Sequence, residues 1–432
     1  MKAEIKHRIE LIRQGKVPEG YKRVKDGIIP FNWKQYCFGE LGENKNGLNF
    51  HRGDKGSKIR IVGVGDFGNL SVLREVDALS EISLAFIPDD EFLLKNGDIV
   101  FVRSNGSKEL VGRNLLVYPQ NENVSFSGFC IRFRLHSDKI TMPEYINLVL
   151  DNGVLKRKLQ SENQGSNISN LNQNIIDNLQ ISIPCKAEQQ KIVAILTTQD
   201  KVIALKENRL TEKKRQKKYL MQQLLTGKKR LPGFSGEWKK VKLSEVVSER
   251  KEKNIRQNLR ICSVAVQKGV VDQIEHLGRS YAANDTSNYS VAYYGDIIYT
   301  KSPTGDFPYG IIKQNLLRET VAVSPLYGIF TPMTFGLGYF LHTYFQSAIN
   351  ARNYLLPIIQ KGAKNTINIT NDTFISNKLY LPLDEEEQNA IANIFIAADR
   401  EIELLRQDIE QEKQKKKALM QLLLTGIVRV TA

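Results

Sequence analysis

The sequence predicts an α+β protein in which two globular α/β domains are separated by two long helices that form an antiparallel coiled coil. Three observations predict this fold. The second half of the 432-residue chain repeats motifs of the first half in the same order. Each half opens with short β-like runs broken by glycine, asparagine and proline, and each closes with a long charged stretch that lacks proline. The motifs recur after about 200 residues, which indicates a duplicated domain with pseudo-two-fold symmetry and not a solenoid.

The clearest repeated motif lies at the end of each charged stretch. Residues 219–227 read Tyr-Leu-Met-Gln-Gln-Leu-Leu-Thr-Gly, and residues 418–426 read Ala-Leu-Met-Gln-Leu-Leu-Leu-Thr-Gly. Both motifs close on a glycine, as expected where a helix stops with positive φ. Three further motifs match across the halves: a tryptophan, a Gly-Asp pair before a β-like run, and a Glu-Gln pair at the start of the charged stretch (Trp33 and Trp238; 97–98 and 295–296; 188–189 and 387–388).

These matches set the predicted domain boundaries. A lead-in and the first globular domain occupy 1–186, and the first helical spacer occupies 187–230. The second globular domain occupies 231–385, and the second helical spacer occupies 386–432. Because the first helix carries the chain from the first domain to the second, the second helix must run back antiparallel if the two helices pair. Its end is then expected to reach the lead-in of the first domain.

The charged stretches show the three- and four-residue spacing of a coiled-coil seam. Eight of ten seam positions are apolar in the second stretch and six of ten in the first. The weaker first seam is expected to rely on partner subunits for part of its burial. Packing of each helix on its own domain alone remains the alternative. The residues predicted to pack in the seam are Ile192, Leu196, Ile203, Leu210, Leu220, Leu224, Ile391, Phe395, Ile402, Leu405, Ile409, Leu419 and Leu423.

The charge favours a polyanionic partner. There are 62 Lys and Arg residues against 47 Asp and Glu, which gives a net charge of +15 and favours DNA through counterion release. A basic protein without a nucleic-acid partner is the alternative. The sequence has no apolar run long enough to span a membrane, no apolar segment of a secretory signal after Met1, and no CxxC pair among its four cysteines. We therefore expect a cytoplasmic location.

We expect loops that follow the matched β-like runs to carry side chains that read or anchor DNA. Arg, Lys and Asn reach base edges, while Ser, Thr and Lys mostly anchor phosphates. Arg103-Ser104 and Lys301-Ser302 follow matched runs and are the leading pair, although ordinary strand-end loops would look the same. The predicted DNA-binding residues are Arg52, Lys55, Lys58, Arg103, Ser104, Asn105, Lys108 and Arg113 in the first domain, and Lys268, Lys301, Ser302, Thr304, Tyr309 and Lys313 in the second.

One motif suggests an enzyme. Residues 63–68 satisfy the GxGxxG pattern of nucleotide-binding loops after a β-like run. The second half has no counterpart, the chain has no adenine-methylase loop of the NPPF type, and its five histidines are isolated. We expect these glycines to serve a change from strand to turn, and we expect no catalytic and no metal-binding residues in this chain.

The chain resembles the specificity subunits of type I restriction–modification enzymes. The resemblance is carried by residues 224–234 before Trp238, by the Pro-to-Glu-Gln starts of both charged stretches, and by residues 165–171, with a looser counterpart at 362–368. It covers nearly the whole chain.

The resemblance implies that the globular domains are target-recognition domains. Because the two domains differ outside the matched motifs, we expect them to bind an asymmetric, bipartite site on double-stranded DNA. It implies that the helices scaffold two adenine-methyltransferase subunits and, through them, ATP-dependent restriction subunits. S-adenosylmethionine, ATP and Mg are then expected only in the partner subunits. The alternatives are a free-standing sequence-specific DNA-binding protein, a specificity subunit of a related methyltransferase–nuclease system, and a methyltransferase that uses residues 63–68.

Overall fold

The computed structural model describes residues 3–25, 27–51, 54–68, 70–107, 109–120, 122–152, 171–279, 284–361 and 367–430. The chain divides into two compact units. Unit 1 contains Met1–Leu205 and Ile409–Ala432, and unit 2 contains Lys206–Asp408. Each unit therefore combines one globular domain with part of both long helices, α6 (Lys186–Leu224) and α11 (Glu385–Leu423).

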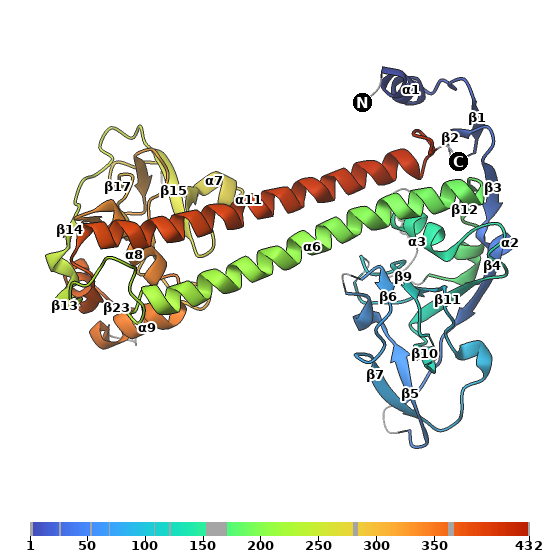
Figure 1. Ribbon diagram of the computed structural model, residues 1–432, viewed down its shortest axis with the longest axis horizontal. Coiled ribbons are helices and arrows are strands. Elements are labelled where there is room, and N and C mark those ends of the chain that lie inside the picture. Colours follow the sequence, from blue (N-terminus) through green and yellow to red (C-terminus); the bar gives the residue numbers. More distant parts are fainter. Residues whose placement is uncertain are drawn as a thin grey trace. The chain divides into compact units, whose positions relative to one another are not determined.

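Unit 1 is built on a five-stranded sheet in the order β4-β11-β8-β9-β6, beside a three-stranded sheet in the order β10-β5-β7 (Figure 1). Two small antiparallel pairs, β1-β2 and β12-β3, complete its strands. The described elements are α1 (Ala3–Arg13), β1 (Tyr21–Val24), β2 (Gly27–Pro30), β3 (Lys34–Cys37), α2 (Phe38–Leu41), β4 (Gly42–Asn46), β5 (Ser57–Val62), η1 (Val64–Phe67), β6 (Val72–Leu73), β7 (Ser80–Leu84), η2 (Asp90–Phe92), β8 (Asp98–Val102), β9 (Asn114–Val117), β10 (Val124–Phe126), β11 (Cys130–Leu135), α3 (Pro143–Asp151), α5 (Gln173–Asp177) and β12 (Gln180–Ile183).

Unit 2 is built on two four-stranded sheets, in the orders β14-β21-β18-β19 and β16-β15-β20-β17, with the pairs β13-β24 and β22-β23. Its described elements besides the long helices are β13 (Lys239–Lys242), η3 (Leu243–Glu245), β14 (Val247–Glu249), β15 (Arg260–Ala265), β16 (Gly269–Asp272), α7 (Gln273–Leu277), β17 (Ser290–Ala292), β18 (Ile297–Tyr299), β19 (Ile312–Gln314), β20 (Val321–Val323), β21 (Gly328–Pro332), α8 (Phe335–Tyr344), α9 (Ala348–Leu355), η4 (Leu356–Ile358), β22 (Gln360–Lys361), β23 (Ile367–Asn368), α10 (Asn371–Ser376) and β24 (Lys378–Leu381).

The central strand of each unit is buried on both faces. Ile99 and Phe101 of β8 enter one hydrophobic cluster, while Val100 and Val102 enter another. In unit 2, Ile297 and Tyr299 of β18 pack in one cluster and Ile298 lies in a second. Because side chains alternate along a strand, a strand covered on both faces is apolar throughout and shows no polar alternation.

The two units repeat the same strand order and register. The order β4-β11-β8-β9 of unit 1 recurs as β14-β21-β18-β19 in unit 2. Ile99 lies opposite Phe133 in unit 1, and Ile297 lies opposite Phe330 in unit 2. The predicted internal repeat of two α/β domains is therefore confirmed.

The two long helices pair antiparallel inside each unit. As residue numbers rise along α6, those of the bonded partners fall along α11, which requires opposite directions. The pairs are Gln199 with Glu412 (2.6 Å) in unit 1, and Lys206 with Asp408 (2.8 Å), Lys213 with Glu401 (2.9 Å) and Lys217 with Asp399 (2.5 Å) in unit 2. These are the four polar seam positions of the first helix, which we expected to need partner subunits. They bond to the second helix instead.

The predicted seam residues lie inside the helix pair or the clusters beside it. All thirteen lie in the described part of the chain, where ten are buried and three are half-buried. The buried ones are Ile192, Leu196, Ile203, Leu224, Ile391, Phe395, Ile402, Leu405, Ile409 and Leu423, and the half-buried ones are Leu210, Leu220 and Leu419.

Candidate functional site

A carboxylate at the start of α6 ties unit 1 together. Glu188, which is 2% exposed, accepts a hydrogen bond from Trp33 Nε1 at 3.2 Å. Arg429 donates to both of its oxygens, from Nε at 2.7 Å and from Nη2 at 2.8 Å, and its guanidinium lies over the Trp33 ring. Such two-point pairing between a guanidinium and a carboxylate is among the stronger polar contacts in proteins.

Unit 2 contains the same three-residue arrangement. Glu387 accepts from Trp238 Nε1 at 3.2 Å, and Arg230 donates to its two oxygens at 2.6 and 2.7 Å. Arg230 likewise lies over the Trp238 ring. Sequence reasoning found both tryptophans and both Glu-Gln pairs, and its motif at 224–234 includes Arg230, but it assigned no role to either arginine. The signal was present, since an arginine follows each Leu-Thr-Gly motif at the same distance. We name these two sets the helix junctions.

The segment after α11 closes unit 1. The Tyr21 hydroxyl donates to the carbonyl of Gly426 at 2.8 Å, and Arg8 donates to the carbonyl of Ile427 at 2.6 Å. Gly426 has φ 71, and an added Cβ would lie 2.5 Å from Pro30 and 3.2 Å from Trp33. The expected return of the second helix to the lead-in is therefore confirmed within this unit.

The glutamines of the Glu-Gln pairs anchor each helix to its domain. Gln189 accepts from Thr141 at 3.0 Å and donates to the carbonyl of Pro184 at 3.0 Å. Gln388 accepts from Thr334 at 2.7 Å and donates to the Pro382 carbonyl at 2.9 Å. The repeated Glu-Gln motif thus has a structural role. The loops after β8 and β18 take no part in it and can differ in sequence between the two units.

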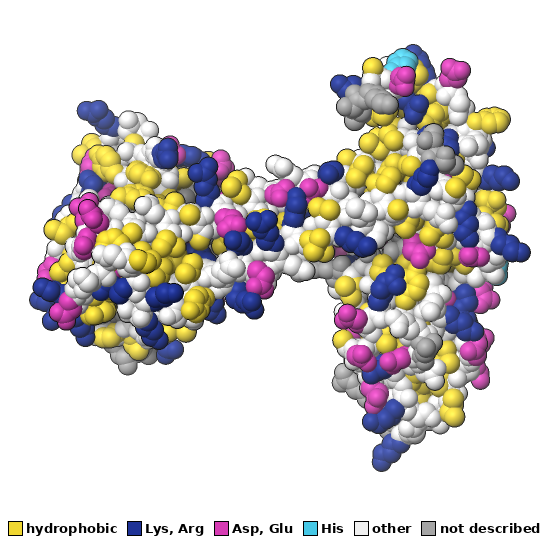
Figure 2. Space-filling view, in the orientation of Figure 1, with side chains coloured by type: hydrophobic (Ala, Val, Ile, Leu, Met, Phe, Trp, Pro, Cys, Tyr) yellow, Lys and Arg dark blue, Asp and Glu magenta, His cyan; other side chains and the backbone are white. Residues whose placement is uncertain are grey.

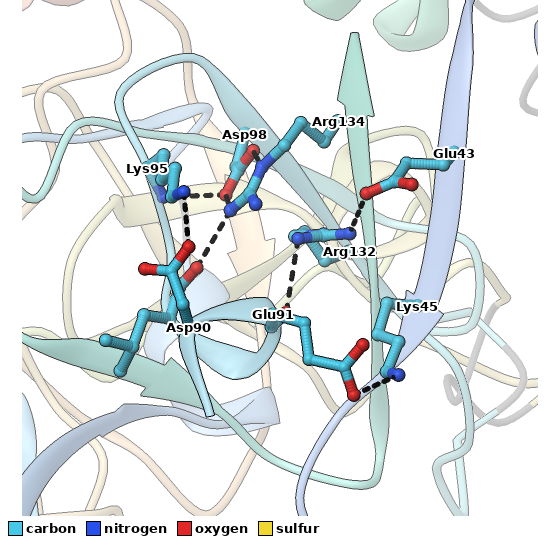
Figure 3. A network of polar contacts seen from close by, with 9 residues as sticks. Glu43, Lys45, Asp90, Glu91, Lys95, Asp98, Arg132 and Arg134 are labelled. Atoms are coloured by element: carbon cyan, nitrogen blue, oxygen red, sulfur yellow. Dashed lines mark hydrogen bonds and ion pairs between the residues drawn. The ribbon is translucent and has the colours of Figure 1, made fainter. Parts of the chain in front are cut away.

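The Gly-Asp pairs also have a structural role. Asp98 is buried and accepts from Arg134 Nε at 2.8 Å and Nη2 at 2.7 Å, and from the backbone N–H of Lys95 (Figure 3). Beside it, Arg132 bonds to Glu43 at 2.8 Å. In unit 2 the matching Asp296 accepts from Arg250 instead.

The loop after β8 holds the leading candidates of unit 1. The Arg103 N–H donates to the Phe129 carbonyl at 2.8 Å, and its guanidinium reaches the Gly128 carbonyl at 3.4 Å. Asn105 Oδ1 accepts from the N–H of Ser107 at 2.8 Å. Arg103, Ser104 and Asn105 are half-buried at this edge, so the loop is held in place by its own backbone.

The loop after β18 is similarly fixed. Lys301 has φ 60, a strained backbone for a residue with a side chain. An added Cβ on Gly310 would lie 2.8 Å from the Lys301 nitrogen, so glycine is required there. Thr304 and Phe307 exchange two backbone hydrogen bonds of 3.0 Å, while Tyr299 Oη donates to the Tyr309 carbonyl at 2.7 Å. Burial lowers the pKa of Lys301.

The remaining candidates are dispersed. Lys55, Lys268, Ser302 and Thr304 are exposed, Lys58 forms an ion pair with Glu81 at 2.8 Å, and Arg113 bonds to the Gly68 carbonyl. Lys313 is 4% exposed, and burial together with the charge of Lys217 lowers its pKa to about 8, so its ammonium does not face solvent. Arg52 and Lys108 lie outside the described residues, as does most of 165–171. On the face drawn in Figure 2, basic side chains alternate with acidic ones in each unit.

The glycine-rich segment does not continue as a nucleotide-binding helix. Within the described residues, 64–67 form one short 3-10 helix and the next element is strand β6. Asp66 accepts from the N–H of Gly63 at 2.7 Å, which closes the turn. A dinucleotide site needs a longer helix directly after the glycines. These glycines therefore serve the change from strand to turn.

Residues 30–215 match the sequence profile of the type I restriction modification DNA specificity domain. The StySPI specificity subunit of Salmonella potsdam is 32% identical over 154 residues, which are 34% of this chain and 32% of that protein. The MjaVIII specificity subunit of Methanocaldococcus jannaschii is 26% identical over 300 residues, 63% of this chain and 67% of that protein. This chain is similar to type I restriction specificity subunits. The chain thus spans about a third of the StySPI subunit and two thirds of the MjaVIII subunit.

A solved structure extends the likeness of this specificity-subunit fold to nearly the whole chain. The S subunit of a type I restriction–modification system from M. genitalium matches this chain with a TM-score of 0.55 at 12% sequence identity. The match covers 93% of this chain and 97% of the M. genitalium chain. None of the helices in the described part of the chain is long and apolar enough to span a membrane. The described residues also contain no cluster of three or more His, Cys, Asp or Glu side chains that could hold a metal ion.

Proposed function

We propose that this chain is the DNA sequence-specificity subunit of a type I restriction–modification complex and reads an asymmetric, bipartite site. The observation that carries the proposal is the contrast, within one chain, between helix junctions that repeat and loops that differ. Both helix junctions use Trp, Glu and Arg at nearly the same distances. The loops after β8 and β18 differ in sequence and backbone.

The loops are suited to two different DNA half-sites. The first loop offers Arg103 and Asn105, which can pair with guanine and adenine edges. The second offers Lys301, Ser302 and Thr304, which suit phosphates and single base contacts. A net charge of +15 supports attraction to DNA as a whole. Two unlike readers imply that the two halves of the site also differ.

The repeated surfaces suit two copies of one partner. Because the fold is duplicated, its outer surface is repeated too, so we infer that two adenine-methyltransferase subunits bind, and that restriction subunits join through them. We further propose that this chain performs no catalysis, and that S-adenosylmethionine, ATP and Mg act in the partner subunits. The chemistry of the complex would then be directed, but not carried out, by this chain.

The decisive experiment combines assembly with methylation mapping. The chain is purified together with a type I adenine methyltransferase from the same genome, and native mass measurement is expected to give two methyltransferases per chain. Long-read sequencing of DNA methylated by this complex is expected to show one site with two unlike halves and a fixed gap. A lack of association, or methylation without any fixed sequence, would overturn the proposal. Tight, site-specific binding by the chain alone would instead favour a free-standing DNA-binding protein.

A further inference from the structure

A large apolar side chain is exposed at the tip of one turn in each unit. Phe129, in the turn between β10 and β11, is 62% exposed. Leu326, in the turn between β20 and β21, is 71% exposed. Single exposed apolar residues are ordinary on protein surfaces. A role for these two residues must therefore be argued from their positions in the fold and not from their exposure alone.

The strand register makes the two tips equivalent. Phe133 pairs with Ile99 in unit 1, and Phe330 pairs with Ile297 in unit 2. Phe129 precedes Phe133 by the same number of residues as Leu326 precedes Phe330. The duplicated fold thus places an exposed apolar group at one matched position in both units, although the residue type has changed.

Each tip has a cation at the matched position of the neighbouring strand. Arg103 donates its backbone N–H to the Phe129 carbonyl at 2.8 Å, and its guanidinium reaches the adjacent Gly128 carbonyl at 3.4 Å. The unit 1 turn is fixed by backbone hydrogen bonds from the Gly128 N–H to the Leu48 carbonyl at 2.7 Å and from the Cys130 N–H to the Ser127 carbonyl at 2.8 Å. In unit 2, Lys301 occupies the position that matches Arg103, just beyond the Tyr299–Gly328 pair. A fixed apolar tip beside a cation fits a surface that is apolar inside and anionic outside, which describes a DNA groove.

We propose that Phe129 and Leu326 are base-contacting residues, one for each half of a double-stranded DNA site. The inference rests on the proposed function. The apolar tip meets base edges, such as the methyl group of thymine, next to the base or phosphate that the neighbouring cation contacts. The difference between Phe and Leu accords with unlike half-sites. A surface that binds two copies of one methyltransferase would instead be expected to carry the same residue in both units. The helix junctions, in contrast to the tips, do carry the same residues in both units.

The test uses the complex of this chain with its methyltransferase and the DNA site found by methylation mapping. Phe129→Ala is expected to weaken binding to the cognate duplex about tenfold, the cost of one poorly matched base pair. Base changes in one half of the site should then reduce the DNA affinity of the Phe129→Ala complex less than that of the wild-type complex. Base changes in the other half should reduce the affinity of both complexes equally. Leu326→Ala is expected to show the reverse assignment. The slope of log Kd against log salt stays unchanged, because no charge is removed.

Two control variants match the tips in exposure. Phe31 and Ile349 are each 71% exposed and lie elsewhere in their units, so Phe31→Ala and Ile349→Ala are expected to leave DNA binding unchanged. Equal binding by Phe129→Ala and wild type would overturn the inference. Loss of methyltransferase association would overturn it too, because the tip would then contact protein. Thermal unfolding checks that each variant folds. If the wild-type complex recognises no site at all, the proposed function fails, which is a separate outcome.

Discussion

Arg429, beyond the second long helix, forms a two-point ion pair with Glu188 at the start of the first, with distances of 2.7 and 2.8 Å. More than two hundred residues separate the two partners in the sequence. The same pairing joins Arg230 to Glu387 in unit 2 across the other helix end. A buried carboxylate therefore depends, in each unit, on an arginine that follows the opposite helix.

Removing Arg429 should destabilise unit 1. Arg429→Ala leaves the Glu188 carboxylate buried with hydrogen bonds from the Trp33 N–H and the backbone N–H of Val430 but without its cation, and we expect a loss of about 2 kcal/mol in the free energy of unfolding. Denaturant unfolding measures this loss. Arg406→Ala, which removes an exposed pair with Glu403, is the control and should cost less than about 0.5 kcal/mol. Equal effects of the two variants would contradict the role assigned to the junction.

Glycine at the end of α11 should be required for packing as well as for backbone conformation. Gly426 and Gly15 have nearly the same φ, 71 and 72, but an added Cβ meets Pro30 only at Gly426. Gly15→Ala is therefore expected to cost about 1 kcal/mol from backbone strain alone. Gly426→Ala should cost clearly more, as judged by the shift in thermal unfolding. Similar shifts for the two variants would contradict this prediction, because they would mean that Pro30 and Trp33 move to accommodate the added Cβ at little cost in free energy.

Lys313 should make stability rise in alkaline solution. Burial and the charge of Lys217 lower its pKa from 10.5 to about 8, while Asp399 opposes the shift. Below pH 8 the folded protein carries the cost of a buried charge, about 3 kcal/mol. Between pH 8 and 10.5 the folded state releases this proton before the unfolded state does, so the cost disappears.

Lys313→Met is expected to be more stable than the wild type at pH 7, and the difference should shrink as the pH is raised from 8 to 10. Urea unfolding of both proteins across this range measures the difference, which removes the contribution of tyrosines common to both. Lys268→Met, at an exposed lysine, should show no such trend. A difference that does not change with pH would refute the buried-charge explanation.

Arg103 should contribute to one half-site only. In the complex with methyltransferase, Arg103→Ala is expected to reduce binding by about 1–3 kcal/mol and to relax base preference in one half of the site. Lys301→Ala should affect the other half. Competition binding with duplexes altered in each half provides the measurement. A uniform loss on unrelated sequences would make Arg103 a phosphate anchor.

The sequence predicted the parts of the fold that are periodic or repeated. The seam of Ile391, Phe395 and Ile402 was readable because helices bury every third or fourth residue. Arg429 was missed because its partner is remote in sequence, although its spacing from Gly426 repeats that of Arg230 from Gly227. Such a match identifies equivalent residues but does not say what they touch.

Other features depend on tertiary packing that local patterns do not encode. Lys313 lies on β19, where all three residues are buried, so strand alternation gave it no solvent side. The guanidinium that meets the repeated aspartate comes from β11 in unit 1, as Arg134, but from beyond β14 in unit 2, as Arg250. The equivalent buried aspartates thus pair with arginines from non-equivalent positions, which an alignment of the two halves does not reveal.

The division of the chain also affects how the protein is made. Unit 2 is one continuous segment, Lys206–Asp408, so it can fold on the ribosome as soon as that segment has emerged. Unit 1 requires Ile409–Ala432 in addition to Met1–Leu205. The domain synthesised first is therefore completed last. Until Ile409–Ala432 has been synthesised, Glu188 lacks its Arg429 partner and the apolar side of early α6 lacks Leu423, so the core of unit 1 stays incomplete.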